Sequence, residues 1–532
     1  MEPNSKSMPL SLELSYLYID WFCHDGKPSR YAVLLHFLNI WLWDGKDDNL
    51  FPTRQSDFLL DMVENEDRVI RANALSCIVL LTMKFGDRLP KTVTDKFVLW
   101  AENNVLNEEF IEVQKFLLAT ISGQKKQKKL RDEVIEKMHK EQQTMRDRLG
   151  MADDDDERME IAEEGNKRMM SYAQKLNDMV QEGVDMNLGT FASLRGLDFF
   201  KDLKNWLIDF NINHPKLQEL GEKKAMADAL FGHAELCDLD KYALASIVGK
   251  ISAAESISQN LPEQLTNQLT GENAQAILRD ERERNAYRYV FQTLFRFFSL
   301  SPWSEEVQNP FLLGPFLTDY STLAPMVTDS FLKESARQFM SYGFYSHPAV
   351  YLRSWMHRNG QSDEALEMLA YCDKQLGENK ERLLCLLELE KRHPDDMRLI
   401  RETGLSLIHE KRYEEALQRF FHLEVKENYL HGSARAIAWC SLMTGNLARA
   451  GRYYKKLLSW EGGPGWEDLL NAGHCAWLNG DPIEASSLYS RYLDMHNDEL
   501  EAFDNDHDIL MSLGLSADDI SLMRDTIAIL PQ

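Results

Sequence analysis

The sequence predicts an all-α protein whose C-terminal third is a helical repeat, preceded by other helical domains. Nearly every apolar stretch recurs at three- to four-residue spacing, which is the period of a buried helix face. No Asn-Gly hairpin signal stands between alternating apolar runs. Three windows near the C-terminus also share one pattern in register. Because single cores stop growing near about 250–300 residues, we expect about two to four structural units.

The composition indicates a folded, acidic chain. Hydrophobic residues make up 44% and charged residues 27%, close to the averages of globular proteins. The formal net charge of −25, from 85 acidic and 60 basic side chains, would repel a polyanion and forgo the counterion release that drives nucleic-acid binding. We therefore expect no nucleic-acid partner.

The cysteines and the N-terminal segment predict a cytoplasmic location. The seven cysteines include no CxxC pair, so they read as reduced core thiols rather than disulfides or zinc ligands. Leu12–Phe22 is interrupted by Glu13, Ser15 and Asp20 and does not resemble a signal peptide. The most apolar segment, Tyr31–Trp43, is well short of the roughly 20 residues that cross a bilayer. We expect no membrane span and no cofactor.

A first helical domain is expected over residues 1–122. One apolar helix face consists of Ile70, Ala74, Ile78, Leu81 and Phe85. The next residue, Gly86, is placed to end this helix. The sequence of Arg68–Leu75 resembles the second helix of a HEAT or armadillo pair. An ordinary helical bundle fits the same residues.

Residues 123–186 differ in composition and predict a charged linker or arm. A basic run at 124–129 and an acidic run at 153–157 flank helix formers with almost no aromatic residues. Such a segment buries little surface, so we expect two exposed helices joined by an acidic loop. The basic run could contact phosphate, but a solvated helix face is favoured because the acidic run offsets it.

A central helical domain is expected over residues 187–345. Its aromatic series is interleaved with arginines, as on a platform that stacks single-stranded nucleic acid. However, Tyr287, Phe291, Phe295 and Phe298 follow at intervals of four, four and three, the spacing of one buried helix face. Acidic residues at 280, 281 and 283 neutralise the nearby arginines. Core packing is therefore the favoured interpretation.

The C-terminal repeat has a period of 34 to 35 residues. In each window a small residue is followed twelve positions later by an alanine and four positions after that by an aromatic ring: Gly404, Ala416, Phe420; Ala438, Ala450, Tyr454; and Gly473, Ala485, Tyr489. Such periods mark helix–turn–helix solenoids. The small residue would let the second helix approach, and the ring would fill the space between pairs. Gly445 and Gly480 would shape the turns.

This pattern resembles the tetratricopeptide repeat over about residues 346–498. A degenerate fourth copy contains Gly360, Ala365 and Leu369, and the 51 residues from Ala365 to Ala416 require an extra helix around Glu381–Arg392. The tryptophan that the family places early in the first helix is replaced by Ile400, Ala434 and Leu469, and the closing proline is missing at Asn428. Residues 499–532 are expected to form capping helices.

The resemblance implies a concave groove, lined by the first helix of each pair, that binds a peptide or protein. The groove candidates are Arg398, Arg401, Leu405, Arg435, Trp439, Asn471, His474 and Trp477. Because guanidinium groups bind carboxylates in a bidentate manner, we hypothesise an acidic peptide or a C-terminal carboxylate as ligand, with an apolar anchor on Trp439. Leu405 replaces the asparagine of carboxylate-clamping members, which argues against a chaperone-tail receptor. The alternative is that the arginines pair with neighbouring acids on a solvated face.

Catalytic and metal motifs are scarce. HExxH, GxSxG, GxGxxG and P-loop patterns are absent, and Ser330 and Lys333 share a serine–lysine spacing without a companion motif. Asp504–Asp508 begins like a calcium loop, but Ile509 and Leu515 occupy the glycine and glutamate positions. We therefore expect a non-enzymatic scaffold or adaptor, with self-association possible through the N-terminal units. The alternative is a regulatory subunit or an enzyme with a site in the central domain, which a deep polar pocket there would favour.

Overall fold

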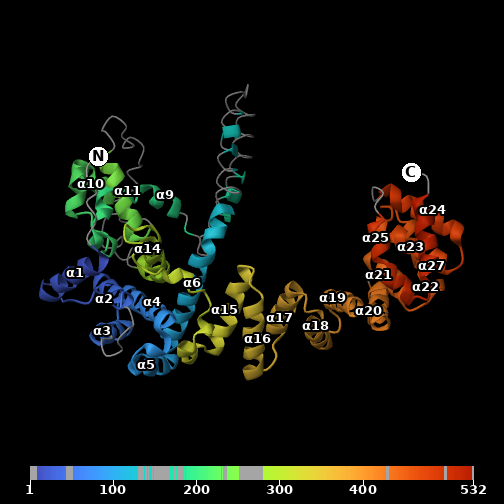
Figure 1. Cartoon of the computed structure of the whole chain (residues 1–532), viewed down its shortest axis with the longest axis horizontal. Helices are drawn as coiled ribbons and strands as arrows, with labels where there is room; N and C mark the ends of the chain where they lie inside the picture. Colours follow the sequence, from blue (N-terminus) through green and yellow to red (C-terminus); the bar gives the residue numbers. More distant parts are fainter. Residues whose placement is uncertain are drawn as a thin grey trace. The chain divides into compact units, whose positions relative to one another are not determined.

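The structure, a computed structural model, consists of two compact units, Met1–Gln338 and Phe339–Gln532, which we call unit 1 and unit 2 (Figure 1). It describes residues 9–129 except 25 and 44–51, short pieces of 137–175, residue 185, residues 187–250 except 229, 230 and 232–235, and residues 280–529 except 427–430 and 496–499. These residues form helices and turns and contain no strand. The fold is all-α, as predicted. Most of the expected arm at 123–186, including its acidic run, lies outside the described residues.

Unit 1 is a helical bundle. Its α-helices are α1 (Leu10–His24), α2 (Arg30–Trp41), α3 (Thr53–Val63), α4 (Arg68–Phe85), α5 (Lys91–Ala101), α6 (Asn104–Lys129), α9 (Leu188–Leu194), α10 (Lys224–Ala227), α11 (Asp238–Lys250), α14 (Ala286–Leu300) and α15 (Asp329–Ser341), of which α15 continues past the boundary. Its 3₁₀ turns are η2 (Gly86–Arg88), η4 (Asp198–Lys201), η5 (Leu203–Trp206), η6 (Pro215–Lys223), η10 (Pro310–Leu312), η11 (Leu317–Asp319) and η12 (Ser321–Met326).

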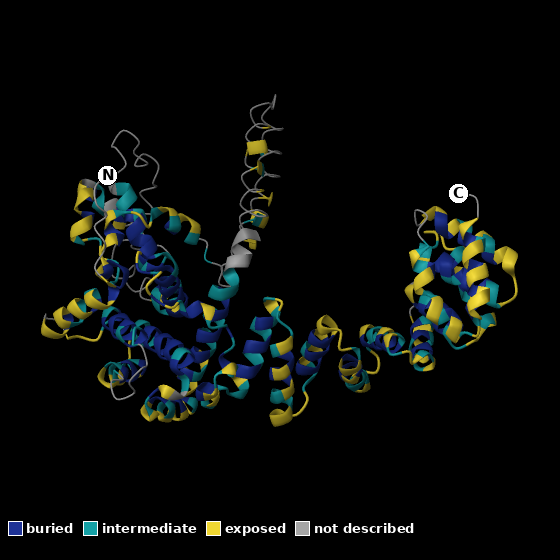
Figure 2. Ribbon diagram, in the orientation of Figure 1, coloured by how far each residue is buried: buried dark blue, intermediate teal, exposed yellow. Residues whose placement is uncertain are grey.

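The centre of unit 1 is α4, which packs against α2, α3 and α14. Residues of α4 are buried on all sides, as the dark ribbon of Figure 2 shows. Gly86 ends this helix with a φ of 53°, as its position in the sequence predicts. A helix surrounded on several sides is the central member of a bundle, so this packing favours the bundle over the HEAT pair.

One core joins the segments that the sequence analysis divided into domains 1–122 and 187–345. Phe298 of α14 contacts the rings of Phe37 and Trp41 of α2, with centroids 6.2 and 5.6 Å apart. The Tyr287 hydroxyl donates a hydrogen bond of 3.0 Å to Glu109 of α6. Helices α2 and α4 are apolar around most of their circumference, so α14 supplies cover that the first 122 residues do not provide.

The aromatic series of α14 lies in this core. Tyr287, Phe291 and Phe298 are buried, and the guanidinium of Arg296 is enclosed between Asp185 and Asp240 at 2.7 and 3.0 Å. Buried rings cannot stack on bases, so core packing is confirmed over a nucleic-acid platform.

Unit 2 is a repeat of paired helices. Its helices are α16 (Ser346–Asn359), α17 (Asp363–Leu376), α18 (Asn379–Arg392), α19 (Met397–His409), α20 (Tyr413–Lys426), α21 (His431–Met443), α22 (Leu447–Leu458), α23 (Trp466–Leu478), α24 (Pro482–Met495), α25 (Glu501–Asn505), α26 (His507–Ser512) and α27 (Ala517–Ala528). Successive helices pack on one another, most closely α17 with α18, α19 with α20, α21 with α22, and α23 with α24. The additional helix expected around 381–392 is α18.

Small residues set the spacing within the pairs, as the repeat pattern predicts. A Cβ atom placed on Gly404 of α19 would lie 2.9 Å from the ring of Phe420 on α20. Ala438 and Tyr454 occupy the equivalent places in α21 and α22 and are both buried. Gly445 and Gly480 adopt φ angles of 73° and 79°, the left-handed conformation expected for inter-helix turns.

The last helices cover the end of the repeat. Ile520, Met523 and Ile527 of α27 are buried in the same core as Tyr489 of α24. An apolar side of α24 is thereby removed from water.

Candidate functional site

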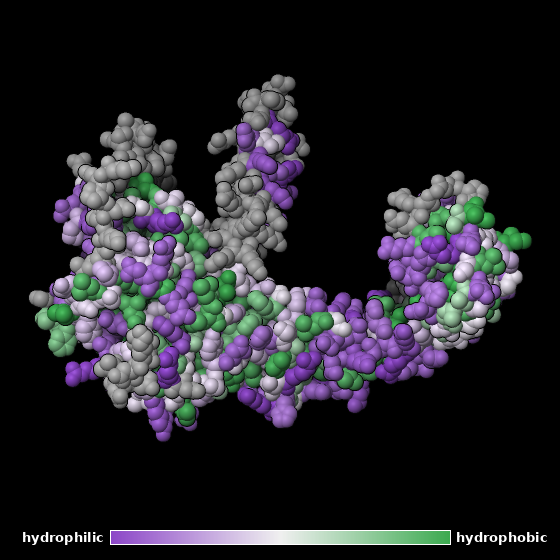
Figure 3. All heavy atoms as spheres, in the orientation of Figure 1, coloured by the Kyte–Doolittle hydropathy of each residue, from purple (hydrophilic) through white to green (hydrophobic). Residues whose placement is uncertain are grey.

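The predicted groove residues lie on the first helices α19, α21 and α23 of three successive pairs. The surface over α17–α20 is largely hydrophilic in the view of Figure 3. Arg398 and Arg435 of the predicted groove both have intramolecular carboxylate partners. Arg398 contacts Glu367 of α17 at 2.8 Å, with both side chains half or more exposed. This part of the face matches the alternative of paired arginines on a solvated surface.

Arg435 is held more firmly than Arg398. Its Nε and Nη2 donate to the two carboxylate oxygens of Asp468 at 2.6 Å each. Asp468 is 1% exposed and also accepts the N–H of Gly465 at 3.0 Å, which caps α23. This bidentate contact raises the pKa of Arg435. The guanidinium surface that was expected to bind a ligand carboxylate is thus occupied by a carboxylate of the chain itself.

His474 does not face a groove. Its side chain is 1% exposed. Nδ1 lies 3.0 Å from the Tyr489 hydroxyl and Nε2 lies 3.3 Å from Asp506. The ring therefore links α23 to α24 and to the residue that precedes α26. The expectation that His474 lines the ligand site is corrected, because its position on the helix turns the ring toward the next pair.

The other predicted residues retain accessible surface. Leu405 is 40% exposed, and Arg401, Trp439, Asn471 and Trp477 are partly buried. Trp439 packs against the apolar residues of two adjacent repeat cores. The first helices therefore present one exposed aliphatic side chain and two partly accessible indoles.

A cavity that sequence reasoning missed lies among α22, α23 and α24. Its volume is about 350 Å³, and none of the predicted groove residues lines it. Arg452 and Lys455 of α22 stand in its wall together with Asp481 and Glu484 of the α24 segment. The small residues Ala448 and Gly451, three positions apart on α22, are the sequence signal for this hollow.

Unit 1 contains a charged pocket of about 550 Å³. It is formed where α2, α4 and α11 begin, together with residues 209–210 and 281–283. Two arginines and two aspartates in it form a closed quartet. Arg30 lies 2.8 Å from Asp238 and 3.5 Å from Asp209, while Arg282 lies 3.6 Å from Asp238 and also contacts Asp209.

A smaller recess of about 20 Å³ adjoins the charged pocket and shares Arg30, Asp238, Lys241 and Arg282 with it. Burial lowers the pKa of Lys241. Asn73 also lines this recess, and its buried Oδ1 has no hydrogen-bond partner among the described residues. Clustered titratable groups in a pocket are the feature that would favour the enzyme or regulatory alternative.

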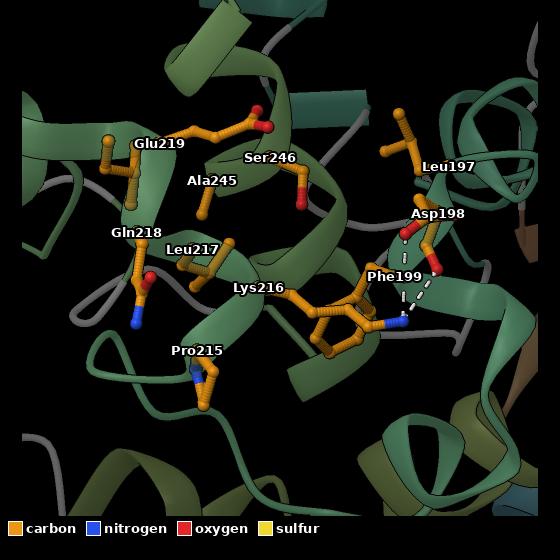
Figure 4. Close-up of a pocket in the computed structure, with 11 residues that line it drawn as sticks. Leu197, Asp198, Phe199, Pro215, Lys216, Leu217, Gln218, Glu219, Ala245 and Ser246 are labelled. Carbon is orange, nitrogen blue, oxygen red and sulfur yellow. Dashed lines mark hydrogen bonds and ion pairs between the residues drawn. The ribbon is translucent and has the colours of Figure 1, made fainter.

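A further pocket of about 290 Å³ lies between η6 and α11 (Figure 4). Lys216 reaches across it to Asp198, donating to the backbone oxygen at 3.2 Å and approaching the carboxylate at 3.8 Å. Both side chains are solvent-exposed, so this contact resembles an ordinary surface ion pair.

Metal-binding geometry is absent from the described residues, in which no three His, Cys, Asp or Glu side chains are grouped to hold an ion. Asp504, in the incomplete calcium loop, instead binds Arg524 at 2.7 Å. No helix among the described parts of the chain is long and apolar enough to cross a membrane. All seven cysteines are free, and Cys23 alone among them is exposed.

Comparisons with known proteins found similarity in solved structures alone. No family model and no curated protein matches the chain. MamA residues 41 to the end from Desulfovibrio magneticus RS-1 aligns at 12% identity and a TM-score of 0.29, covering 32% of this chain and 96% of MamA. A tetratricopeptide repeat protein from Parabacteroides merdae aligns at 19% identity and a TM-score of 0.26. The alignment covers 37% of this chain and 84% of that protein.

Yeast Tom70 aligns over 97% of this chain and 96% of its own, at 10% identity and a TM-score of 0.24. These likenesses are weak, so the assignment of the repeat rests on the helix pairing and the packing of its small and aromatic residues.

Proposed function

We propose that this chain is a non-enzymatic scaffold that binds a protein or peptide partner on the first helices of unit 2. The observation that carries the proposal is the accessible apolar surface on α19, α21 and α23, namely exposed Leu405 and the partly exposed rings of Trp439 and Trp477. Indole rings with accessible surface on a rigid support are frequent anchors in protein interfaces. The buried contacts between small residues and rings provide that rigid support.

The chemistry of the proposed ligand follows from how firmly each arginine is bound by a carboxylate of the chain itself. A carboxylate that displaced Asp468 from Arg435 would leave a buried charge without its partner, which is costly. Displacing the exposed Glu367 from Arg398 costs much less. We therefore propose an apolar anchor as the main contact, with an acidic residue or a C-terminal carboxylate bound near Arg398 and Arg401.

A peptide-display selection on the full chain tests this proposal. The affinity of a selected peptide, measured by titration calorimetry, should fall at least about tenfold in the double variant Leu405→Glu, Arg401→Glu. The matched control is Arg491→Glu, an exposed arginine on the second helix α24. Unchanged affinity in the groove variant, with both proteins folded, would refute the groove.

A regulatory or catalytic role for unit 1 is the second candidate, supported by the charged pocket. Its volume lies within the range of about 300–1,000 Å³ of small-molecule sites. Thermal shift of the full chain against amino acids, polyamines and phosphorylated metabolites tests this role. A shift that Glu283→Gln removes and Asp280→Asn retains would support it, since residue 283 lines the pocket and residue 280 does not.

A cytoplasmic location is also part of the proposal. It is supported by free cysteine thiols, of which all but Cys23 are buried. Thiols persist in reducing compartments and tend to form disulfides in secreted proteins.

A further inference from the structure

Helix α1 is apolar on two opposite sides. On one side, Leu10, Leu14 and Trp21 are buried in the core of unit 1. On the other side, Leu12, Tyr16, Ile19 and Phe22 are 46%, 59%, 59% and 72% exposed. Their intervals of four, three and three residues place them in one stripe along the helix. A helix with apolar residues on all sides is normally packed against other elements on all sides. The exposed side of α1 lacks such a packing partner.

The stripe is held facing outward. The N–H of Leu10 donates to Glu306 at 3.0 Å, and Glu13 accepts the N–H of Leu203 at 3.3 Å. Together with the buried side chains, these bonds fix the rotation of α1. The helix carries exposed residues along its length in Figure 2, and apolar side chains gather in Figure 3 where Figure 1 places α1. A contiguous exposed apolar patch of this kind marks an interaction surface.

We propose that this stripe is a self-association surface, on which α1 of two copies of the chain pack antiparallel about a twofold axis. The four residues are nearly symmetric about the middle of the helix, since positions 12 and 22 centre on 17 and positions 16 and 19 on 17.5. An antiparallel partner therefore places Leu12 against Phe22 of the second copy and Tyr16 against Ile19. Twofold contacts require such self-complementarity, because the same patch meets itself. This inference is independent of the proposed ligand groove in unit 2.

The charges on α1 are compatible with a second copy. The helix contains no Lys or Arg, and on the exposed side its acidic residue is Asp20, which pairs with Lys204 at 3.9 Å. In the antiparallel arrangement Asp20 lies level with Leu14 and Ser15 of the second copy, and its contact with Lys204 offsets its charge in a chain whose net charge is −25. Helices that bind membrane surfaces instead carry basic residues beside the apolar stripe, which α1 does not.

The area of the stripe sets the strength of the association. A large side chain of this kind has roughly 150–250 Å² of surface. The exposed parts of the four side chains therefore amount to about 400–500 Å² in each copy. Two copies would bury about 800–1,000 Å², which is below the 1,200–2,000 Å² of stable complexes and above most crystal contacts. We therefore expect a weak dimer whose population depends on concentration.

Disulfide trapping of the full chain tests both the surface and its register. Cys23 is exposed, and an antiparallel pair places it opposite exposed Ser11 of the second copy. Oxidation of the Ser11→Cys variant with copper-phenanthroline should rapidly give a covalent dimer. The native chain and the double variant Ser11→Cys, Cys23→Ser should not, because equal positions lie about 12 residues, or roughly 18 Å, apart along the axis. A native chain that crosslinks as fast, or a single variant that does not crosslink, would overturn the proposed arrangement.

Sedimentation equilibrium of the uncrosslinked chain provides the second measurement. The mass should rise with concentration, and Tyr16→Ser with Ile19→Ser should weaken the dimer at least about tenfold. Val98→Ser with Leu99→Ser, at two exposed residues of α5, is the matched control and should leave the dimer unchanged. A chain that stays monomeric, or that is monomeric and binds vesicles of phosphatidylcholine and phosphatidylglycerol through Tyr16 and Ile19, would overturn the proposal.

Discussion

A Cβ atom placed on Gly473 of α23 would lie 2.3 Å from Cε1 of Tyr489 on α24. No methyl group fits at that distance, so this glycine sets how closely the two helices of the last pair approach. The backbone of Gly473 is helical, and its role is therefore to leave space rather than to permit an unusual turn.

Gly473→Ala is expected to destabilise the chain by about 1–2 kcal/mol. Overpacking against the buried ring costs about 1–3 kcal/mol, and the higher helix propensity of alanine returns up to about 1 kcal/mol. Urea unfolding monitored by circular dichroism measures the difference. Gly451→Ala on α22 is the control with the opposite sign. The atom nearest its new methyl group lies 3.9 Å away, so the propensity gain should dominate. Equal effects at both sites would refute the packing role.

Arg435→Met is expected to destabilise the chain by about 1–3 kcal/mol, because it leaves the carboxylate of Asp468 buried without its bidentate partner. The estimate is moderate because Arg435 is itself 41% exposed, so water screens the pair. Arg398→Met removes a pair whose members are both exposed and should cost less than about 1 kcal/mol. Thermal unfolding of the two variants compares them, and a larger loss for Arg398→Met would contradict the burial argument.

The repeat could be predicted from the sequence because its determinants are local and periodic. Gly404, Ala416 and Phe420 lie within one helix pair, so their spacing alone defines the packing. The expected groove residues could be assigned to their helices, but their exposure could not be predicted, because it depends on which acidic side chains contact them. Asp468 nevertheless follows Arg435 by 33 residues, about one repeat. Residues one repeat apart lie on equivalent helices of adjacent pairs, here α21 and α23. That spacing is the signal that could have paired them.

The architecture of unit 1 could not be read in the same way. Periodicity shows that α2 and α4 each have apolar faces, but it does not show that α14, more than 200 residues away in sequence, covers them. The two domains predicted over residues 1–122 and 187–345 therefore share a single core. The exposed side of α1 could not be predicted from the sequence for a related reason. Its apolar residues occupy both faces, and sequence alone does not show which face is covered.

The shared core of unit 1 predicts that residues 1–129 do not fold alone. Without α14, the rings of Phe37 and Trp41 lose their contact with Phe298, and α2 and α4 expose apolar faces to water. Near-ultraviolet circular dichroism of this fragment should show no fixed aromatic packing. Co-expression with residues 187–338 should restore it. Cooperative unfolding of the 1–129 fragment by itself would contradict the single core.

His36 predicts a loss of stability at mildly acidic pH. Its buried ring lies 4.0 Å from the ring of Phe58 and 4.8 Å from that of Trp21, centroid to centroid, and burial lowers its pKa to about 4. The ordinary histidine pKa is about 6.5, so the unfolded chain binds more protons between these values. This group's contribution to the unfolding free energy is therefore full above about pH 6.5 and falls by roughly 3 kcal/mol as the pH drops toward 4. His36→Phe keeps the ring stacking and removes the titration. Urea unfolding from pH 7 to 4.5 should give a shallower decline for the variant than for the native chain, and parallel declines would show that His36 does not carry the effect.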